Sequence, residues 1–337
     1  MNENYSKAMA IRQYIDATDK RYIWNDHVRE SFTVMYERMS NEKRLFYFAN
    51  ERFGSVSDCF IIYAIMILGV CDILSIQNFL HALHNMSTEL SLLDYEDLSS
   101  LRSRIKKLVD VGFLAKNVYR TEGVTEDKST SYMNLYSCTS EAVEFATKRL
   151  SRPYKFMSWL QAMRPQELIS WAAASRIGTT LALYPTFKEF GLGKVYSNKN
   201  SYYLPCELKY QLRDTEYNVA VMNTFLYFDK SVMTESDYKD YVIDKLNTIL
   251  QYVTYRSKVC EARVVCVVED NTNLTTLAKW IKKAERLRDI LPALYFTGEG
   301  VVNELNGDVA NSMVQLVLSD RYEAGFTFVQ TVPDFLG

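Results

Sequence analysis

The chain has 337 residues, of which 48% are hydrophobic and 24% are charged, an ordinary composition for a globular protein. At this length we expect two domains. Lys and Arg number 39 against 41 Asp and Glu, for a formal net charge of −2. This balance excludes a protein that binds polyanions through its overall charge, so any nucleic-acid role must come from a local basic patch.

Residues 1–50 contain neither Pro nor Gly, and their apolar positions, such as Ile11, Tyr14 and Ile15, are loosely periodic. We therefore predict a helical N-terminal extension over residues 1–54, which ends where Gly54 and Ser55 interrupt the pattern. Residues 1–20 are polar and of mixed charge, unlike a secretory signal peptide.

The longest apolar run in the chain, CFIIYAIMILGVC, covers residues 59–71. A helix that spans a bilayer needs about 20 apolar residues, so this run is too short and predicts a fully buried helix. We accordingly expect a cytoplasmic protein with no membrane partner.

Neither cysteines nor histidines form a metal-binding pattern. The cysteines include no C-x-x-C pair, and most lie in apolar runs, which predicts buried, reduced thiols. His81 and His84 stand three residues apart, but no Cys or carboxylate set joins them at ligand spacing. No metal and no cofactor is therefore expected.

Two helices are predicted between residues 75 and 111. Ser75 occupies a position suited to an N-cap ahead of IQNFLHALHNM. In the next segment, LSSLRSRIKKLVDVG, the apolar residues fall on one side of a helix, and Gly112 suits a C-cap. The apolar stripe consists of Leu98, Leu101, Ile105, Leu108 and Val109.

Two β-prone runs follow Gly112 and flank a polar loop that contains a glycine, which predicts a hairpin. Thr139 then suits the N-cap of a helix, SEAVEFATKRL. Three helices followed by a hairpin is the order of a winged helix, in which the third helix enters a DNA major groove. Residues 96–120 hold six basic and three acidic residues, a local net charge of +3 that favours phosphate contacts.

The predicted DNA-binding residues divide into two groups. Ser99, Arg102, Ser103 and Lys106 are expected to reach base edges, and Arg104 flanks the same helix face. The residues expected to hold phosphates are Lys107, Lys116, Arg120 and Lys128. A solvated helix face with no ligand is the alternative interpretation of the same charges.

The pattern changes after Pro153 and Pro165. A helix is predicted at 165–182, strands at 202–210 and 218–228, and a helix from Thr234 to about residue 252. A buried strand at 262–268, a helix at 273–290 and a strand at 293–298 follow, with further strand-like runs VQLVLS and FTFVQTV. Strands that alternate with helices imply an α/β domain with a parallel portion.

The stretches LSSLRSRIKKLVDVGFLAKNVYR, YMNLYSCTSEAVEFATKRL and YVIDKLNTILQYVTYRSKVCEARVVCVVED resemble the replication-relaxation family of plasmids, phages and conjugative elements. The resemblance covers residues 55–300 and implies a winged helix followed by a restriction-endonuclease-like domain. Winged helices commonly act as dimers on repeated half-sites, so we also expect a homodimer bound to double-stranded DNA.

Nuclease versions of such a domain hold Mg²⁺ with a Pro-Asp and an acid-x-Lys on the next strand. Here PCELK places Cys206 where that aspartate would stand, while Glu207 and Lys209 keep the acid-x-Lys form. Asp229 is the one acid at the end of the next predicted strand. Because the set is incomplete, we expect an inactive domain and no enzyme activity.

Three hypotheses remain. The preferred one is an α+β protein with a helical extension at 1–54, a winged helix at 55–152 and an α/β nuclease-like domain at 153–337. It would be a sequence-specific DNA-binding protein of a mobile element, acting as a transcriptional regulator or a replication accessory factor. The alternatives are a metal-dependent DNA nuclease that uses Glu207, Lys209 and Asp229, and a winged helix that binds protein.

Overall fold

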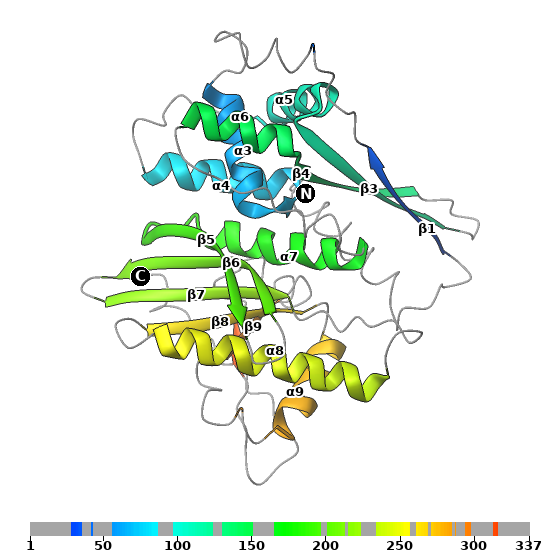
Figure 1. Cartoon of the computed structure of the whole chain (residues 1–337). Helices are drawn as coiled ribbons and strands as arrows, with labels where there is room; N and C mark the ends of the chain where they lie inside the picture. Colours follow the sequence, from blue (N-terminus) through cyan, green and yellow to red (C-terminus); the bar gives the residue numbers. More distant parts are fainter. Residues whose placement is uncertain are drawn as a thin grey trace. The chain divides into compact units, whose positions relative to one another are not determined.

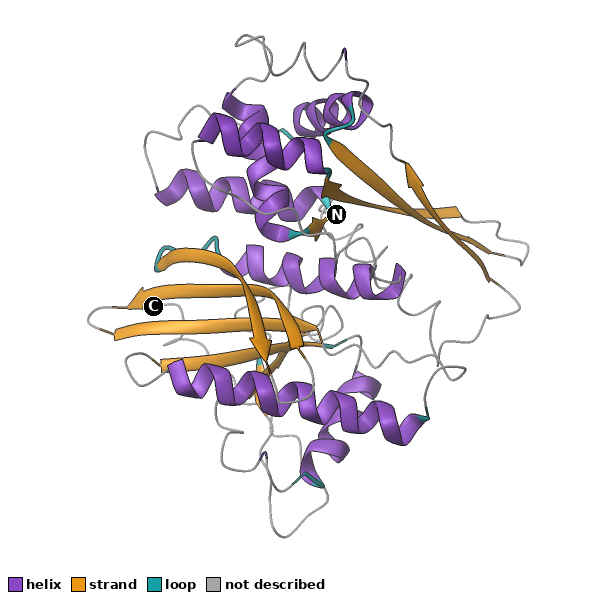
Figure 2. Cartoon of the chain, viewed as in Figure 1, coloured by secondary structure: helices purple, strands orange, loops and turns teal. Residues whose placement is uncertain are grey.

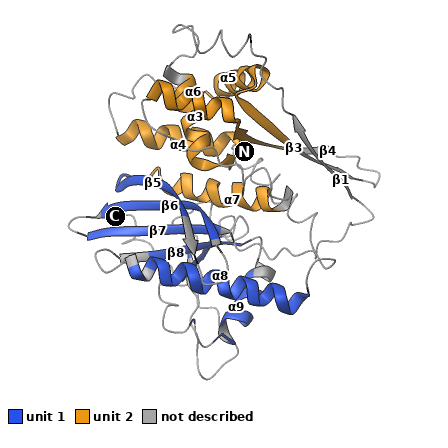
Figure 3. Ribbon diagram, in the orientation of Figure 1, with its two compact units in different colours: residues 1–25, 184–337 blue, residues 26–183 orange. Residues whose placement is uncertain are grey.

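The computed structural model has an α+β fold, as the sequence predicts, with seven helices and two sheets in the part of the chain that it describes (Figures 1 and 2). The described residues are 28–35, 42, 56–86, 97–123, 130–150, 165–196, 201–212, 215–223, 234–256, 261–268, 271–284, 287, 294–297 and 313–315. The chain divides into two compact units, residues 26–183 and residues 184–337 together with 1–25 (Figure 3).

Five helices belong to the unit of residues 26–183. They are α3 (Val56–Leu68), α4 (Ile73–Met86), α5 (Leu98–Val111), α6 (Ser140–Leu150) and α7 (Pro165–Leu181). The apolar run at 59–71 forms most of α3, where Ile61, Ile62 and Ile65 are fully buried. The predicted buried helix is therefore confirmed. α4 begins before the predicted cap, because Asp72 accepts a hydrogen bond from the Ser75 amide at 2.8 Å and so takes the capping role.

The sheet of this unit has the order β1-β3-β4-β2, and every pairing in it is antiparallel. Its strands are β1 (Val28–Met35), β2 (Val70–Cys71), β3 (Leu114–Gly123) and β4 (Thr130–Cys138). β3 and β4 are the predicted hairpin. β2, the short link between α3 and α4, pairs with β4.

β1 corrects the prediction of a helical extension over residues 1–54. Residues 28–35, VRESFTVM, form a strand that pairs with β3 along its whole length, from Val28 opposite Gly123 to Met35 opposite Lys116. The β-branched residues Thr33 and Val34 suit this strand. Loose apolar periodicity did not reveal it, because its partner lies about 90 residues away in the chain. The other residues of 1–54, apart from Glu42, lie outside the described residues.

Thr139 connects three elements of this unit, because it lies between β4 and α6 and contacts the end of α5. Its hydroxyl lies 3.0 Å from the carbonyl oxygens of both Gly112 and Phe113, and it accepts a hydrogen bond from the Ala142 amide at 3.2 Å. The predicted N-cap is confirmed. Thr139 is also buried, so its hydroxyl satisfies backbone groups that water does not reach.

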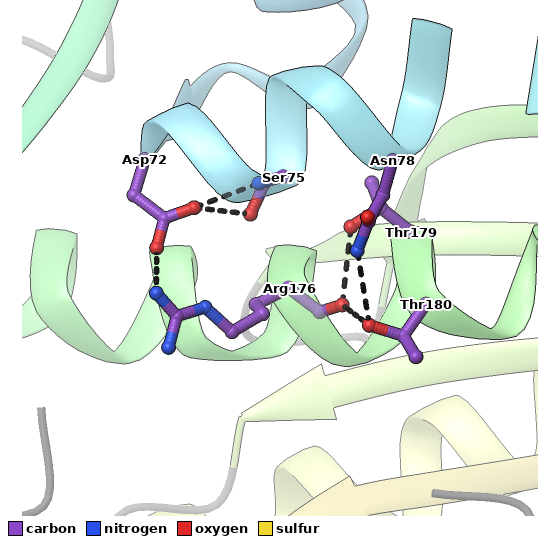
Figure 4. A network of polar contacts seen from close by, with 6 residues as sticks. All are labelled: Asp72, Ser75, Asn78, Arg176, Thr179 and Thr180. Atoms are coloured by element: carbon purple, nitrogen blue, oxygen red, sulfur yellow. Dashed lines mark hydrogen bonds and ion pairs between the residues drawn. The ribbon is translucent and has the colours of Figure 1, made fainter. Parts of the chain in front are cut away.

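α7 is part of the first unit, although the predicted boundary at residue 152 placed it in the second. The Trp171 indole donates a hydrogen bond to the Leu68 carbonyl at 2.8 Å. Arg176 forms an ion pair with Asp72, and the side chains of Asn78 and Thr180 are joined by a hydrogen bond (Figure 4). Prolines mark breaks in secondary structure, whereas these long-range contacts decide which unit a helix joins.

The second unit contains a six-stranded sheet of order β10-β9-β8-β7-β6-β5. Its elements are β5 (Phe187–Tyr196), β6 (Ser201–Leu212), β7 (Thr215–Asn223), α8 (Glu235–Arg256), β8 (Glu261–Val267), α9 (Asn271–Lys282), β9 (Leu294–Thr297) and β10 (Val314–Gln315). β5, β6 and β7 form an antiparallel meander, whereas β8 runs parallel to both β7 and β9. The predicted parallel portion is therefore confirmed.

One face of this sheet packs against α8 and α9, and the core between them contains Leu246, Leu250, Leu277 and Phe296. Thr234 caps α8 as predicted, since its hydroxyl accepts the Asp237 amide at 3.2 Å.

β5 was not predicted as a strand, because its glycines weaken the strand pattern. Gly193 is required there, since a Cβ at this position would lie 2.8 Å from the Leu204 Cδ1 atom of the neighbouring strand.

The cysteines of the described part, which excludes Cys260, are reduced thiols. Four of them are buried, and burial raises the pKa of Cys59, Cys138 and Cys266. None of the described helices is both long and apolar enough to cross a bilayer.

Candidate nucleic-acid interface

α5 separates its apolar and basic residues onto opposite sides. Leu101, Ile105 and Leu108 are buried, at 0%, 1% and 5% exposure, and hold the helix to the rest of the unit. The opposite side is exposed and carries most of the predicted DNA-binding residues of this helix. These exposed residues are Ser99, Arg102, Ser103, Lys106 and Lys107, with Asp110 near the C-terminal end.

The two ends of α5 are fixed by local hydrogen bonds. Asp97 is the N-cap, and its carboxylate accepts the amides of Ser99 and Ser100 at 2.9 and 3.1 Å. Gly112 ends the helix with φ of 93°, and its amide reaches the Leu108 and Val109 carbonyls. The predicted C-cap is confirmed. Because both ends of α5 are fixed, the direction of each exposed side chain is set by its position in the helix.

Ser99 takes part in the N-cap. Its hydroxyl donates to Asp97 at 2.9 Å, and the Ser100 hydroxyl donates to the same carboxylate at 2.8 Å. The backbone and hydroxyl hydrogen bonds lower the pKa of Asp97 to about 2, so this group is an anion at neutral pH. The predicted role of Ser99 as a donor to a base edge competes with this cap, and the negative charge repels phosphate at the start of the helix.

Arg104 has a carboxylate partner within its own unit. Its Nε donates to the Asp58 Oδ1 at 2.5 Å, and a second guanidinium nitrogen donates to Oδ2 at 3.0 Å. The Arg104 side chain is 34% exposed and that of Asp58 is 13% exposed. The guanidinium of Arg104 therefore faces a carboxylate of α3, and the DNA contact predicted for Arg104 stays a prediction.

Among the predicted phosphate-binding residues of the hairpin, Lys116 is the one whose side chain is described, and it is half-buried on β3. Arg120 also lies on β3, opposite Tyr132 of β4 and Ser31 of β1, so it occupies a central strand. The Arg120 side chain and the whole of Lys128 lie outside the described residues. Their predicted phosphate contacts stay predictions.

Tyr136 lies on β4 of the hairpin, where burial and the charge of Arg102 on α5 influence its pKa. It lies directly opposite Lys116, so the two side chains share one face of the sheet. Burial raises the pKa of Tyr136 to about 12, with an opposing effect from the nearby Arg102 charge. The phenol thus stays protonated at neutral pH. Lys116 is thus the cross-strand neighbour of Tyr136, and Arg102 is close enough for its charge to affect the phenol.

In the second unit, the acid-x-Lys sequence lies on β6, and Cys206 beside it is fully buried. Lys209 Nζ forms an ion pair of 2.5 Å with Glu189 of β5. Asp229 lies outside the described residues. Among the residues that the structure does describe, His, Cys, Asp and Glu form no group of three that could hold a metal ion.

Sequence reasoning missed Asp97, Asp58 and Tyr136. Asp97 had a local signal, because an Asp ahead of a serine pair and an apolar-periodic run is typical of a helix start. Asp58 and Tyr136 had none, since the contact between Asp58 and Arg104 joins residues 46 positions apart. Only the packing of α3 against α5 brings Asp58 and Arg104 together.

Comparisons with known proteins identify no relative for this arrangement. No protein-family model matches the chain, and no significant match was found among curated proteins or among solved structures.

Proposed function

We propose that this chain binds double-stranded DNA sequence-specifically through α5. The observation that carries the proposal is the exposed side of this helix, where Arg102, Lys106 and Lys107 stand together while the apolar side is buried. Three cations against one carboxylate, Asp110, give this side a net positive charge. An α-helix with side chains is about 10–12 Å across and fits a major groove of about 12 Å.

We further propose that the first unit is a winged helix. Its support is the chain order α3, β2, α4, α5, β3, β4, in which the short β2 between two helices pairs with the second strand of the hairpin. In a winged helix the third helix lies in the major groove, and the hairpin beside it contacts the backbone. β1 adds a strand to this sheet beside β3 and would stiffen the hairpin.

For the second unit we propose an inactive restriction-endonuclease-like domain. The order of elements supports this proposal: the antiparallel meander is followed by α8, which connects β7 to the parallel strand β8. The Lys209–Glu189 ion pair engages the lysine of the acid-x-Lys sequence. The proposal includes a homodimer in the cytoplasm, and a role as a regulator or replication accessory of a mobile element. Membership in the replication-relaxation family stays a prediction.

Selection of bound fragments from the source genome, followed by affinity measurements over a range of salt, tests the proposal. We expect one enriched sequence. We also expect Lys106→Gln/Lys107→Gln to reduce the salt slope of binding by about one, because Lys107 is the expected phosphate contact of the two and each phosphate contact contributes about 0.9. Loss of Lys106, which is expected to reach a base edge, should lower the preference for the enriched sequence.

Lys279→Gln/Lys283→Gln is the matched control, since both lysines are exposed on or just after α9 of the other unit. The control should bind as the wild type does. Absence of binding at low salt, or equal losses in the two double variants, would refute the proposal.

A further inference from the structure

The contact between Asp58 and Arg104 is directional. Two guanidinium nitrogens donate to the two oxygens of one carboxylate, at 2.5 and 3.0 Å. Such a bidentate pair is planar and constrains orientation as well as distance. It adds to the apolar contacts of α5, because burial of Leu101, Ile105 and Leu108 turns that face of the helix to the core without a fixed donor–acceptor geometry.

Asp58 is a well-supported anchor for this contact. It lies in the first turn of α3, where the positive end of the helix dipole favours a carboxylate. Ile61, Ile62 and Ile65 of the same helix are fully buried. The ion pair therefore connects a fixed core helix to the helix that carries the exposed cations.

Arg104 lies at the border between the buried and exposed sides of α5, one turn from both Leu101 and Leu108. A rotation of α5 by about 30° about its axis would displace a side-chain tip by about 3 Å, because the helix with side chains is about 10–12 Å across. A displacement of that size breaks a hydrogen bond to a base edge. The direction of the exposed cations thus depends on the rotation of α5 about its axis.

We propose that Asp58 and Arg104 are positioning residues, which set the rotation of α5 and so aim Arg102, Lys106 and Lys107. The consequence for DNA recognition rests on the proposed function. The ion pair itself, and its hold on α5, can be measured without DNA.

The first experiment measures amide hydrogen exchange of the full chain without DNA, in Asp58→Asn, Arg104→Gln and the double variant. Each single change should accelerate exchange in residues 101–111 about tenfold, and the double variant should add nothing, because all three lose the same contact. Glu144→Gln, which removes the exposed Glu144–Lys148 pair of α6, is the control and should leave α5 unchanged. Unchanged exchange in the single variants, or additive effects, would overturn the proposal.

The second experiment measures DNA binding over a range of salt. Asp58→Asn removes a negative charge, so a purely electrostatic effect would tighten binding. Positioning instead lowers the ratio of specific to non-specific affinity about tenfold in Asp58→Asn, Arg104→Gln and Arg104→Lys, with the salt slope unchanged. A reduced slope in Arg104→Gln, with wild-type behaviour in Arg104→Lys, would make Arg104 a phosphate contact.

The two experiments separate the two proposals. A wild-type chain that binds no DNA refutes the proposed function, while the exchange experiment still decides whether the ion pair orients α5.

Discussion

At the scale of single residues, the positively charged side chains of α5 have different surroundings. Lys106 and Lys107 are exposed, whereas Arg104 is held by Asp58 within the unit. The sequence cannot separate these cases, because a charged residue beside an apolar stripe can point to solvent or to a partner on another helix. The same holds for acidic residues. Asp97 caps its own helix and forms no salt bridge with these cations.

The cap at Asp97 predicts a pH dependence. Its pKa in the folded chain is about 2, below the ordinary value of an Asp side chain, so the cap stabilises the fold fully above about pH 4. This stability is lost as the pH falls through the folded pKa. The melting temperature of Asp97→Ala should be below that of the wild type at pH 6, and the difference should narrow toward pH 2.

Thermal unfolding followed by circular dichroism measures this difference. Asp110→Ala, which changes another exposed carboxylate on the same helix, is the control and should show no such narrowing. A constant difference between wild type and Asp97→Ala over the pH range would contradict the assigned cap.

At the scale of elements, the junction at Thr139 fixes the hairpin relative to the helices on either side. Its side chain meets the backbone at the end of α5, at the start of the hairpin and at the start of α6. One buried hydroxyl therefore contacts backbone groups of all three elements. Apolar packing adds to this junction through the rings of Phe113 and Phe145, whose centroids are 4.9 Å apart.

We predict that Thr139→Val lowers the free energy of unfolding by about 1–2 kcal/mol, because it keeps the side-chain shape and removes buried hydrogen bonds. Urea denaturation measures the change. Ser140→Ala, at the exposed next position, is the control and should cost less than about 0.5 kcal/mol. Equal effects of the two substitutions would show that the hydroxyl of Thr139 is dispensable.

At the scale of the whole molecule, the chain combines a unit with a basic helix face and a unit with an α/β sheet. The division lies at residue 183, so α7 belongs with the helices of the first unit. Asp72 and Arg176 strengthen that assignment, since both side chains are largely buried and form an ion pair (Figure 4). The second unit contains an acid-x-Lys sequence, and its lysine, Lys209, forms an ion pair with Glu189.

If the second unit is inactive, purified protein incubated with plasmid and Mg²⁺ or Mn²⁺ should leave the DNA intact at concentrations that saturate binding. The metal ion would need carboxylate ligands to act on a phosphate. Agarose gels that separate supercoiled, nicked and linear forms provide the measurement. Cleavage that is lost in Glu207→Ala and kept in Glu189→Gln would establish the nuclease alternative.

The sequence by itself determined the elements whose signals are local. The α5 stripe, the Gly112 and Thr139 caps, the hairpin and the strand–helix alternation of the second unit follow from periodicity and turn chemistry, which act over a few residues.

Tertiary structure alone decided the strand pairing of β1, the unit that α7 joins and the partner of Arg104. These depend on contacts between residues from 46 to more than 100 positions apart, such as the Trp171–Leu68 hydrogen bond. The physical reason is that the spacing of residues along a helix or strand fixes which face each side chain occupies. The partner of that side chain is set by how this face packs against other elements.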